Sequence, residues 1–259
     1  MSDSTIVLIT GGNTGIGYET VKALYASSKG PYTILLGGRS IEKVNNAIAA
    51  LQKEIPDTAS KLVPLQVDIE SDESITAAFE TVKSSVGYID VLINNAGGQF
   101  DTDKTDESPA SIRTAMNRAY NLNVTSTQVI TMVFEPLLLK SKAPRLLFVT
   151  SGLSSLTTAT AGKNPPPGLK YPWGYLCSKT ALNMQMRGWC NRLEEHGAKT
   201  WCISPGLLAT GLTGAGPEAM KKMGAQGPEI GGVFIKDVVE GARDDRVGLV
   251  VDRAGVQPW

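Results

Sequence analysis

The sequence predicts a doubly wound α/β protein, in which a seven-stranded parallel sheet is flanked by helices. Two observations support this fold class: short runs of Val, Ile and Leu recur along the whole chain, and amphipathic segments of helix length separate them. Strands that alternate with helices favour a parallel sheet with right-handed crossovers. The runs are almost continuously apolar, which is typical of strands covered on both faces. They span residues 6–10, 32–38, 62–68, 91–97, 145–151, 200–206 and 248–252.

The segments between the strands predict five helices, over residues 15–28, 40–54, 72–86, 111–139 and 174–195. Ser40 followed by Glu42, and Ser71 followed by Asp72, are typical helix starts. Their hydroxyls can accept from the unpaired N–H groups of the first turn, and the acid faces the positive end of the helix. Pro136 predicts a break in the fourth helix, because proline cannot donate the helical hydrogen bond.

The chain is expected to form one domain over residues 1–259, because no linker divides it into comparable halves. Two stretches interrupt the alternation of strands and helices. Residues 153–171 contain three successive prolines, which argue against a regular helix, and residues 211–232 are rich in Gly and Pro. Loops at the carboxyl ends of such strands often shape a ligand site, so both are expected to border the substrate. A plain surface insertion is the alternative for the first.

Composition and charge indicate a small-molecule ligand. Lys plus Arg number 25 and Asp plus Glu number 25, so nothing in the net charge favours a nucleic-acid or membrane partner. No signal-peptide pattern opens the sequence and no apolar run reaches spanning length, so a cytoplasmic location is the default expectation. His196 is the only histidine and the three cysteines form no cluster. We therefore expect no metal site and three buried, reduced thiols.

A glycine-rich turn, Thr10-Gly-Gly-Asn-Thr-Gly-Ile-Gly17, joins the first predicted strand to the first predicted helix. Glycines there allow a tight turn and a close approach of the backbone to a pyrophosphate, which a helix N-terminus also stabilises. The turn therefore predicts a dinucleotide site in a Rossmann-type domain. Its spacing differs from the more familiar G-x-G-x-x-G, and a glycine-rich turn alone is weak evidence.

The end of the second strand indicates which dinucleotide binds. Gly37 and Gly38 stand where an NAD-specific fold usually carries an acid for the ribose, and Arg39 follows them. An arginine can pair with a 2′-phosphate that no carboxylate repels, so NADP(H) is the expected cofactor. Arg39 as an ordinary solvated residue is the alternative. Asp68, after the third strand, is expected to accept from the adenine amino group, with helix capping as its alternative.

Two further segments complete the pattern. Residues 94–97, Asn-Asn-Ala-Gly, end the fourth strand, where small residues would let a cofactor lie against the backbone; a strand-ending turn is the alternative. Tyr175 and Lys179 are four residues apart in a predicted helix and so share a face. Positive charge from Lys179 and from oxidised nicotinamide should lower the phenol pKa toward working pH, as an acid/base group for a carbonyl oxygen requires.

In order along the chain, these motifs resemble the full series of the short-chain dehydrogenase/reductase family. The series is residues 10–17, residues 94–97, Asn123, Ser151, Tyr175-x-x-x-Lys179 and Pro205-Gly206-x-x-x-Thr210. The resemblance covers almost the whole chain. Taken singly, each motif also has an ordinary structural role, such as a turn hydroxyl for Ser151 or a helix-interrupting amide for Asn123.

The resemblance implies a role for each matched residue. Tyr175 would protonate the nascent alkoxide, and Lys179 would lower its pKa and bind the nicotinamide ribose. Ser151 would polarise the substrate carbonyl, and Asn123 would hold a water that relays protons from Lys179 to solvent. The segment 205–210 would fix the carboxamide of the nicotinamide. The expected cofactor-binding set is Gly11, Asn13, Thr14, Gly15, Ile16, Gly17, Arg39, Asp68, Ile69, Asn95, Ala96, Gly97, Tyr175, Lys179, Pro205, Gly206, Leu208 and Thr210.

Within that family the chain is most similar to the NADPH-dependent carbonyl reductase group, on Arg39 and on the form of the segment 248–259. The expected reaction is reduction of a hydrophobic or aromatic aldehyde or ketone. The expected substrate-binding residues are Ser151, Leu153, Trp173, Tyr175 and Leu207. The apolar members of that set have packing as their alternative role. An alcohol, hydroxysteroid or polyketide-type dehydrogenase and a non-catalytic NADP(H) sensor stay open as alternatives. Subunit pairing through residues 111–139 and 174–195 predicts a homodimer or homotetramer.

Overall fold

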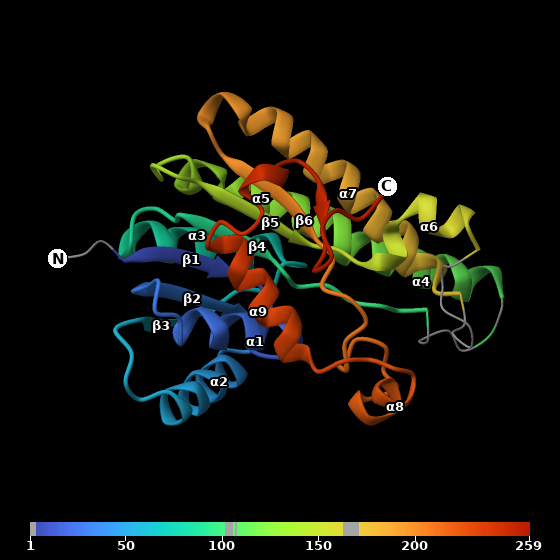
Figure 1. The fold of residues 1–259 in the computed structure, drawn as a ribbon, viewed down its shortest axis with the longest axis horizontal. Coiled ribbons are helices and arrows are strands. Elements are labelled where there is room, and N and C mark those ends of the chain that lie inside the picture. The colour runs from blue at the N-terminus through green and yellow to red at the C-terminus, as the bar shows by residue number, and fades with distance from the viewer. Residues whose placement is uncertain (1–3, 102–105, 107, 163–170) are drawn as a thin grey trace.

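The computed structural model describes residues 4–101, 106, 108–162 and 171–259. Seven parallel strands form one sheet in the order β3-β2-β1-β4-β5-β6-β7, so the predicted fold is confirmed (Figure 1). The crossover direction reverses between the central neighbours β1 and β4, where Val7 pairs with Val91. In open α/β sheets, ligands bind beyond the carboxyl ends of the strands at this reversal. The strands are β1 Thr5–Ile9, β2 Tyr32–Gly38, β3 Lys61–Gln66, β4 Val91–Asn94, β5 Arg145–Val149, β6 Lys199–Ile203 and β7 Val250–Val251.

Successive strand residues face opposite layers, which explains their continuous apolar character. Val7 and Ile9 of β1 belong to the core beneath α1 (Gly15–Tyr25), α2 (Ile41–Glu54) and α9 (Pro228–Val239). Ile6 and Leu8 belong to the opposite core, beneath α3 (Asp72–Ser85), α5 (Thr127–Leu138) and α7 (Trp173–Leu193). The two cores cover both faces of the sheet, so a ligand site can form only from the loops at its carboxyl edge.

The long fourth helix is interrupted, but the predicted break at Pro136 is wrong. Pro136 lies inside α5. The interruption is a π-helical turn over Asn121–Ser126, between α5 and α4 (Pro109–Tyr120). Such turns need a compensating interaction, and here the side chain of Asn123 bonds to residues outside the helix. A contact distant in sequence therefore decides where this helix deforms.

Both expected loops contain helices. The first holds a 3₁₀ turn, Gly152–Ser154, and the short helix α6, Leu156–Thr160, so the exclusion of helix there is wrong for these residues. Its three prolines, residues 165–167, lie outside the described residues. The second holds α8, Pro217–Lys222, and the start of α9. Both α6 and α8 lie beyond the carboxyl ends of the strands (Figure 1).

Helix α9 was not predicted, because Pro228, Gly231 and Gly232 favour a loop in the sequence. Proline is well tolerated at the first position of a helix, where its missing N–H has no partner to lose. Gly232 packs on α1 so tightly that a β-carbon would lie 2.4 Å from the carbonyl carbon of Glu19. Close packing, against α1 for Gly232 and against Pro205 and Leu208 for Gly231, therefore explains these glycines better than intrinsic propensity does.

The three cysteines are free thiols in different environments. Cys202 is buried, Cys190 is half-buried and Cys177 is exposed, so the expectation of three buried thiols is wrong for Cys177. Within the residues that the structure describes, no helix combines the length and apolar character needed to cross a membrane. The same residues contain no grouping of three or more His, Cys, Asp or Glu side chains suited to a metal ion.

Candidate active site

The glycine-rich turn is built as a dinucleotide site requires. Gly11 and Gly15 have positive φ angles of 64° and 56°, a region that side chains rarely adopt. A β-carbon on Gly17 would lie 2.2 Å from the carbonyl oxygen of Gly11, so only glycine fits there. Thr14 caps α1 without a side-chain hydrogen bond, and the first turn carries no acid. The N–H groups of this helix end are therefore available to a phosphate.

Thr10 and Asn95 join the turn to the end of β4. The Thr10 hydroxyl oxygen accepts from the backbone nitrogens of Asn95 and Ala96, both at 3.0 Å. The Asn95 amide donates to the carbonyl oxygens of Thr10 at 2.9 Å and Gly11 at 3.1 Å. Asn95 is expected to bind the cofactor, but its amide nitrogen already holds the two strand ends together. Thr10 shares this role and was missed.

Gly97 lies beside the side chains of Asn123 and Lys179. A β-carbon there would lie 2.8 Å from Oδ1 of Asn123 and 3.2 Å from Nζ of Lys179. The first distance is too short for a real contact, so this backbone must stay bare. Gly97 ends the Asn-Asn-Ala-Gly segment beside Lys179. This cradle fits a nicotinamide ribose, which approaches Lys179 only if no side chain fills the space.

The end of β2 fits the adenosine half of a dinucleotide. Asn13 lies over Gly38, where a β-carbon would be 2.7 Å from its Oδ1. Arg39 follows on the surface, and its guanidinium makes no hydrogen bond or ion pair with the residues that the structure describes. Asp68 accepts from the backbone nitrogen of Glu70 at 3.1 Å, while Ser71 caps α3. One oxygen of Asp68 thus stabilises a local turn, and Ile69 beside it is buried.

The three residues of the predicted chemical site come from two elements. Ser151 follows β5, and Tyr175 and Lys179 lie one turn apart in α7. Nζ of Lys179 is 5.8 Å from the Tyr175 ring centroid and donates to the carbonyl oxygen of Val149 at 2.9 Å. Ser151 hydrogen-bonds Tyr175 through its side chain. Only 6% of Tyr175 and 4% of Lys179 is exposed, so the chemistry is shielded from bulk water.

Burial dominates the proton affinities of this pair. It raises the pKa of Tyr175 to about 12, although the hydrogen bond with Ser151 acts in the opposite direction. Burial lowers the pKa of Lys179 to about 8, and the nearby Cys202 opposes that shift. The expected lowering of the phenol pKa is therefore not produced by these residues alone. A neutral phenol suits a proton donor, and phenolate formation needs added positive charge.

Asn123 is buried in the π-helical turn, and both polar atoms of its side chain form hydrogen bonds within the protein. Its Oδ1 accepts from the backbone nitrogen of Gly98 at 2.9 Å. Its Nδ2 donates to the carbonyl oxygen of Gly98 and to Oγ of Ser178, both at 2.9 Å. The side chain thus fixes the segment after β4 against α7. The expected role of Asn123 in a proton relay stays a prediction.

The segment after β6 lies close to the glycine-rich turn, as expected if both bind one cofactor. Thr210 lies against Gly15, with its Cγ2 3.7 Å from the position of a β-carbon there. Gly206 has a φ of 99°, and Leu208 pairs with Gln226 in an isolated bridge. Pro205 and Leu208 both lie against Gly231 of α9. The unpredicted helix therefore supports the segment expected to hold the nicotinamide carboxamide.

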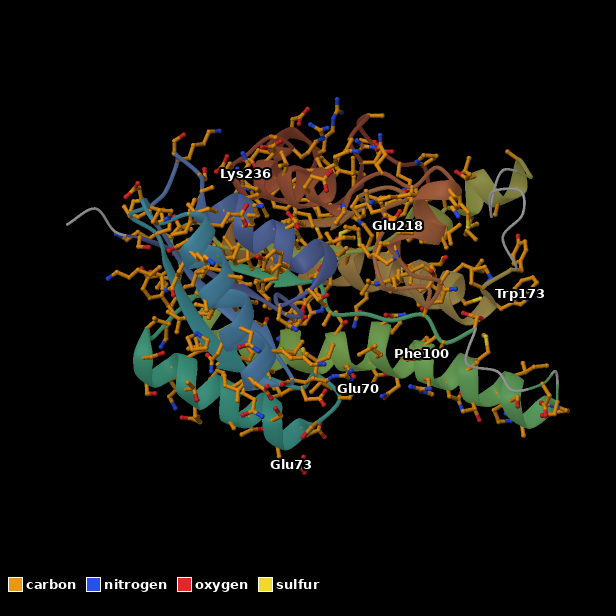
Figure 2. The ribbon with its side chains drawn as sticks, turned by 90° about the horizontal axis from the view of Figure 1, so that it is seen from below. Glu70, Glu73, Phe100, Trp173, Glu218 and Lys236 are labelled. Carbon is orange, nitrogen blue, oxygen red and sulfur yellow. The ribbon has the colours of Figure 1, made fainter. Side chains whose placement is uncertain are left out.

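Apolar side chains border this end of the molecule. Trp173 is 57% exposed, and its ring lies 4.5 Å from that of Tyr171, centroid to centroid. Leu207 is exposed and Leu153 is half-buried. Figure 2 places Trp173 and Phe100 at the same end of the molecule. The Trp173 and Tyr171 rings therefore contact each other and still expose apolar surface to solvent.

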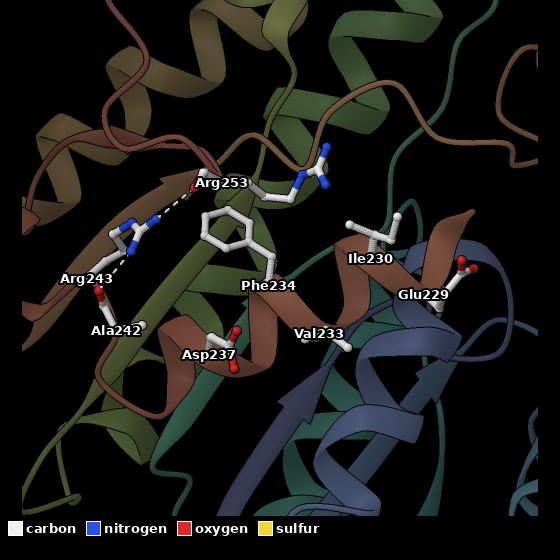
Figure 3. Close-up of a pocket in the computed structure, with 8 residues that line it drawn as sticks. All are labelled: Glu229, Ile230, Val233, Phe234, Asp237, Ala242, Arg243 and Arg253. Atoms are coloured by element: carbon white, nitrogen blue, oxygen red, sulfur yellow. Dashed lines mark hydrogen bonds between the residues drawn. The ribbon is translucent and has the colours of Figure 1, made fainter. Parts of the chain in front are cut away.

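A groove of about 380 Å³ lies elsewhere, along α9 (Figure 3). It mixes acidic and basic side chains, and of the residues that line it only Glu229 and Ile230 belong to a segment, 211–232, that was expected to border the substrate. Of its two arginines, Arg243 donates to the carbonyl oxygens of Ala242, Asp252 and Arg253. The groove is therefore a structural seam between α9 and the segment after β7. It lacks the tyrosine, lysine and serine chemistry described above.

The fold and site together define an oxidoreductase of the nicotinamide-dependent α/β class. The short chain dehydrogenase family model matches residues 5–221. The chain belongs to the short-chain dehydrogenase/reductase family, which acts on CH–OH and C=O groups. It is 43% identical over 272 aligned residues to the short-chain dehydrogenase/reductase tropE of Talaromyces stipitatus, covering 100% of this chain and 99% of the relative. It is 42% identical to eupG of a Phoma species, covering 98% and 97%.

A solved structure supports the fold independently. The NADPH-bound carbonyl reductase from chicken fatty liver superposes with a TM-score of 0.81. The alignment covers 99% of each chain at 22% sequence identity. At that identity the similarity establishes the shared architecture.

Proposed function

We propose that this protein uses NADPH to reduce a hydrophobic or aromatic aldehyde or ketone to an alcohol. The observation that carries the proposal is the buried pair of Tyr175 and Lys179, with the half-buried Ser151, beside the bare backbone of Gly97. This set offers one proton donor, one group to polarise a carbonyl and one cation within a shielded volume. When bound, the nicotinamide supplies the hydride.

In the proposed mechanism, Ser151 donates a hydrogen bond to the substrate carbonyl oxygen and orients it toward Tyr175. Tyr175 then transfers its phenolic proton to the oxygen that becomes the alcohol. Lys179 stabilises the phenolate that remains, because its ammonium is the nearby positive charge. Its pKa near 8 keeps it largely protonated at neutral pH. Reprotonation of Tyr175 then proceeds past Lys179 and Asn123 toward solvent.

NADPH is preferred in this proposal because of Arg39. Glycines occupy the end of β2 where an acid would repel a 2′-phosphate, and the exposed Arg39 guanidinium is unengaged within the described residues. Arginine recognises phosphate through paired N–H donors. The chicken carbonyl reductase with similar architecture was solved with NADPH bound.

The proposed substrate character comes from the exposed aromatic and apolar side chains near the site. Trp173 and Tyr171 precede Tyr175 by two and four residues, and Leu207 follows β6. Exposed aromatic surface of this kind favours a flat apolar ligand. We propose that residues 153–171 and 211–232, with the helices they contain, border the substrate.

The test compares wild type with Tyr175→Phe, using a panel of aromatic ketones, diketones and quinones with NADPH and NADH. We expect NADPH-selective turnover in the wild type and a loss of at least about a hundredfold in Tyr175→Phe. NADPH affinity, measured by fluorescence titration, should stay within about threefold. Tight NADPH binding without turnover across the panel would instead favour a sensor or a reductase with a narrow substrate range.

We also propose a homodimer or homotetramer in the cytoplasm. Outward-facing apolar side chains on the adjoining helices α4, α5 and α7 support association: Tyr120, Met132 and Met184, of which Met184 is 74% exposed. Three free thiols agree with a reducing compartment. Light scattering after size exclusion should give a dimer or tetramer. A concentration-independent monomer would contradict it.

A further inference from the structure

We propose that Gln257 is a positioning residue for Ser151. The segment after β7 folds back toward the loop after β5, and this brings Gln257 to Ser151. This inference rests on the proposed function, because it assigns the role of Gln257 through Ser151. Its evidence is a set of hydrogen bonds that joins residues more than a hundred positions apart in sequence.

The segment after β7 reverses direction in a hydrogen-bonded turn. The backbone nitrogen of Gly255 donates to the Asp252 carboxylate at 2.7 Å, and Val256 forms an antiparallel bridge with Val251. The backbone nitrogen of Gln257 then donates to the carbonyl oxygen of Val250 at 2.9 Å. Arg243, which follows α9, stabilises the turn by donating to the carbonyl oxygens of Asp252 and Arg253. Figure 3 shows the bond to Arg253.

This return brings the Gln257 side chain into the protein interior. The residue is 7% exposed, which is unusual for a glutamine. Its Nε2 donates to the carbonyl oxygen of Ser151 at 3.2 Å and to Oγ of Ser154 at 3.2 Å. A buried amide costs free energy unless it is paired, so these contacts define where the side chain lies.

The Ser154 hydroxyl extends the network and is itself satisfied. It donates to the carbonyl oxygen of Ser151 at 2.6 Å and accepts from Nδ2 of Asn183 at 2.9 Å. Asn183 lies one turn after Lys179 in α7, and its Oδ1 accepts from the Thr150 hydroxyl at 2.8 Å. The peptide oxygen of Ser151 is therefore held from α7, from its own loop and from Gln257.

A second contact holds the far end of the same loop. The carbonyl oxygen of Trp259 accepts from the backbone nitrogen of Thr157 at 2.6 Å and from Oγ of Ser155 at 3.3 Å. One segment thus binds the loop both at Ser151 and at the start of α6. Catalytic geometry is sensitive to such support, since a displacement of about 1 Å can cost about a hundredfold in rate.

The experiment compares Gln257→Leu with Val256→Ala, a control in the same segment whose side chain is exposed. We expect Gln257→Leu to lower kcat about tenfold, with the NADPH dissociation constant and Tm near wild type, and Val256→Ala to change neither kcat nor Tm. The decisive measurement is the double variant. In the Ser151→Ala background, Gln257→Leu should lower kcat less than about twofold, because the Ser151 hydroxyl that Gln257 positions is already absent.

A second variant covers the case in which Gln257→Leu fails to fold. Gln257→Glu replaces the amide donor with a carboxylate that repels the Ser151 carbonyl oxygen, and protonation restores one donor. Its kcat relative to wild type should therefore rise as the pH is lowered, a response that a general loss of stability does not produce.

Two results would overturn the inference while leaving the proposed function in place. One is kcat within twofold of wild type in folded Gln257→Leu. The other is an equal loss from Gln257→Leu with and without the Ser151 hydroxyl. If the wild type shows no turnover, or Tyr175→Phe keeps full activity, the proposed function fails and the role of Gln257 fails with it.

Discussion

The carboxylate of Asp101 accepts a hydrogen bond from the backbone nitrogen of Tyr175 at 3.1 Å. It also accepts from the nitrogen of Gly174 at 2.8 Å. Helix α7 needs this remote partner because Pro172, at its N-cap, supplies no side-chain cap. Asp101 therefore connects the segment after β4 to the turn of helix that carries the proposed proton donor.

Asp101→Ala should destabilise the protein by about 1 kcal/mol, the usual value of a helix cap, and lower kcat by loosening Tyr175. Asp101→Asn keeps one acceptor oxygen but sets an amide N–H against the second backbone N–H, so it should retain only part of both properties. Urea denaturation and steady-state kinetics measure the two effects. Equal activity of Asp101→Ala and wild type would show that the cap is not needed to position Tyr175.

Arg39→Ala should weaken NADPH binding about 10- to 100-fold and leave NADH binding within about threefold, because only NADPH carries the 2′-phosphate. Lys53→Ala, at the opposite end of α2, is the matched control and should affect neither cofactor. Fluorescence titration of both dinucleotides provides the comparison. An equal loss for the two cofactors would remove the argument for phosphate recognition.

Lys179→Met should abolish activity and yet stabilise the cofactor-free protein at pH 7. Burial lowers the folded-state pKa of Lys179 to about 8, so the charged form is disfavoured in the folded state. The cost is fully present below pH 8 and disappears as the pH rises toward the unfolded value near 10.4. The upper bound at pH 7 is about 3 kcal/mol.

Urea denaturation at pH 7 and pH 9.5 tests this prediction. The stability gap between Lys179→Met and wild type should narrow at the higher pH. A gap that widens with pH would contradict the direction of the shift.

Gly17→Ala and Gly188→Ala should have opposite effects on stability. A β-carbon at Gly17 would lie 2.2 Å from the Gly11 carbonyl oxygen and 2.5 Å from Nδ2 of Asn95, so the turn must distort. We expect a loss of several kcal/mol and of cofactor binding. Gly188 lies within α7 with open space around it, and alanine there should stabilise by about 0.5–1 kcal/mol.

Thermal unfolding with and without NADPH separates the two variants. The prediction fails if Gly17→Ala binds NADPH as tightly as wild type does.

Local patterns were sufficient to predict most of the fold. The sheet follows from continuous apolar runs, since a strand covered on both faces needs apolar side chains at every position. The caps of α2 and α3 are side-chain bonds to residues three positions away, at Ser40 and Ser71. Because both partners of such an interaction lie within a few residues of each other, a short stretch of sequence is enough to predict it.

Helix α9, the π-helical turn and the partners of Ser151 could not be read in this way. Gly232 fits a helix only because Glu19 of α1 approaches its backbone. Asn123 deforms its helix through bonds to Gly98 and Ser178. Their partners lie far along the chain, and no local preference encodes those separations.

The sequence by itself predicted the seven strands in order, most of the long helices between them and the motifs of the family, because these depend on side-chain type at short spacing. Only the tertiary structure decided which contacts hold the residues of the proposed site in place. Asp101 reaches the start of α7, and Gln257 reaches Ser151, only after crossovers bring the strand ends to one edge of the sheet. Directed hydrogen bonds depend on the final separation of two atoms, and folding sets that distance.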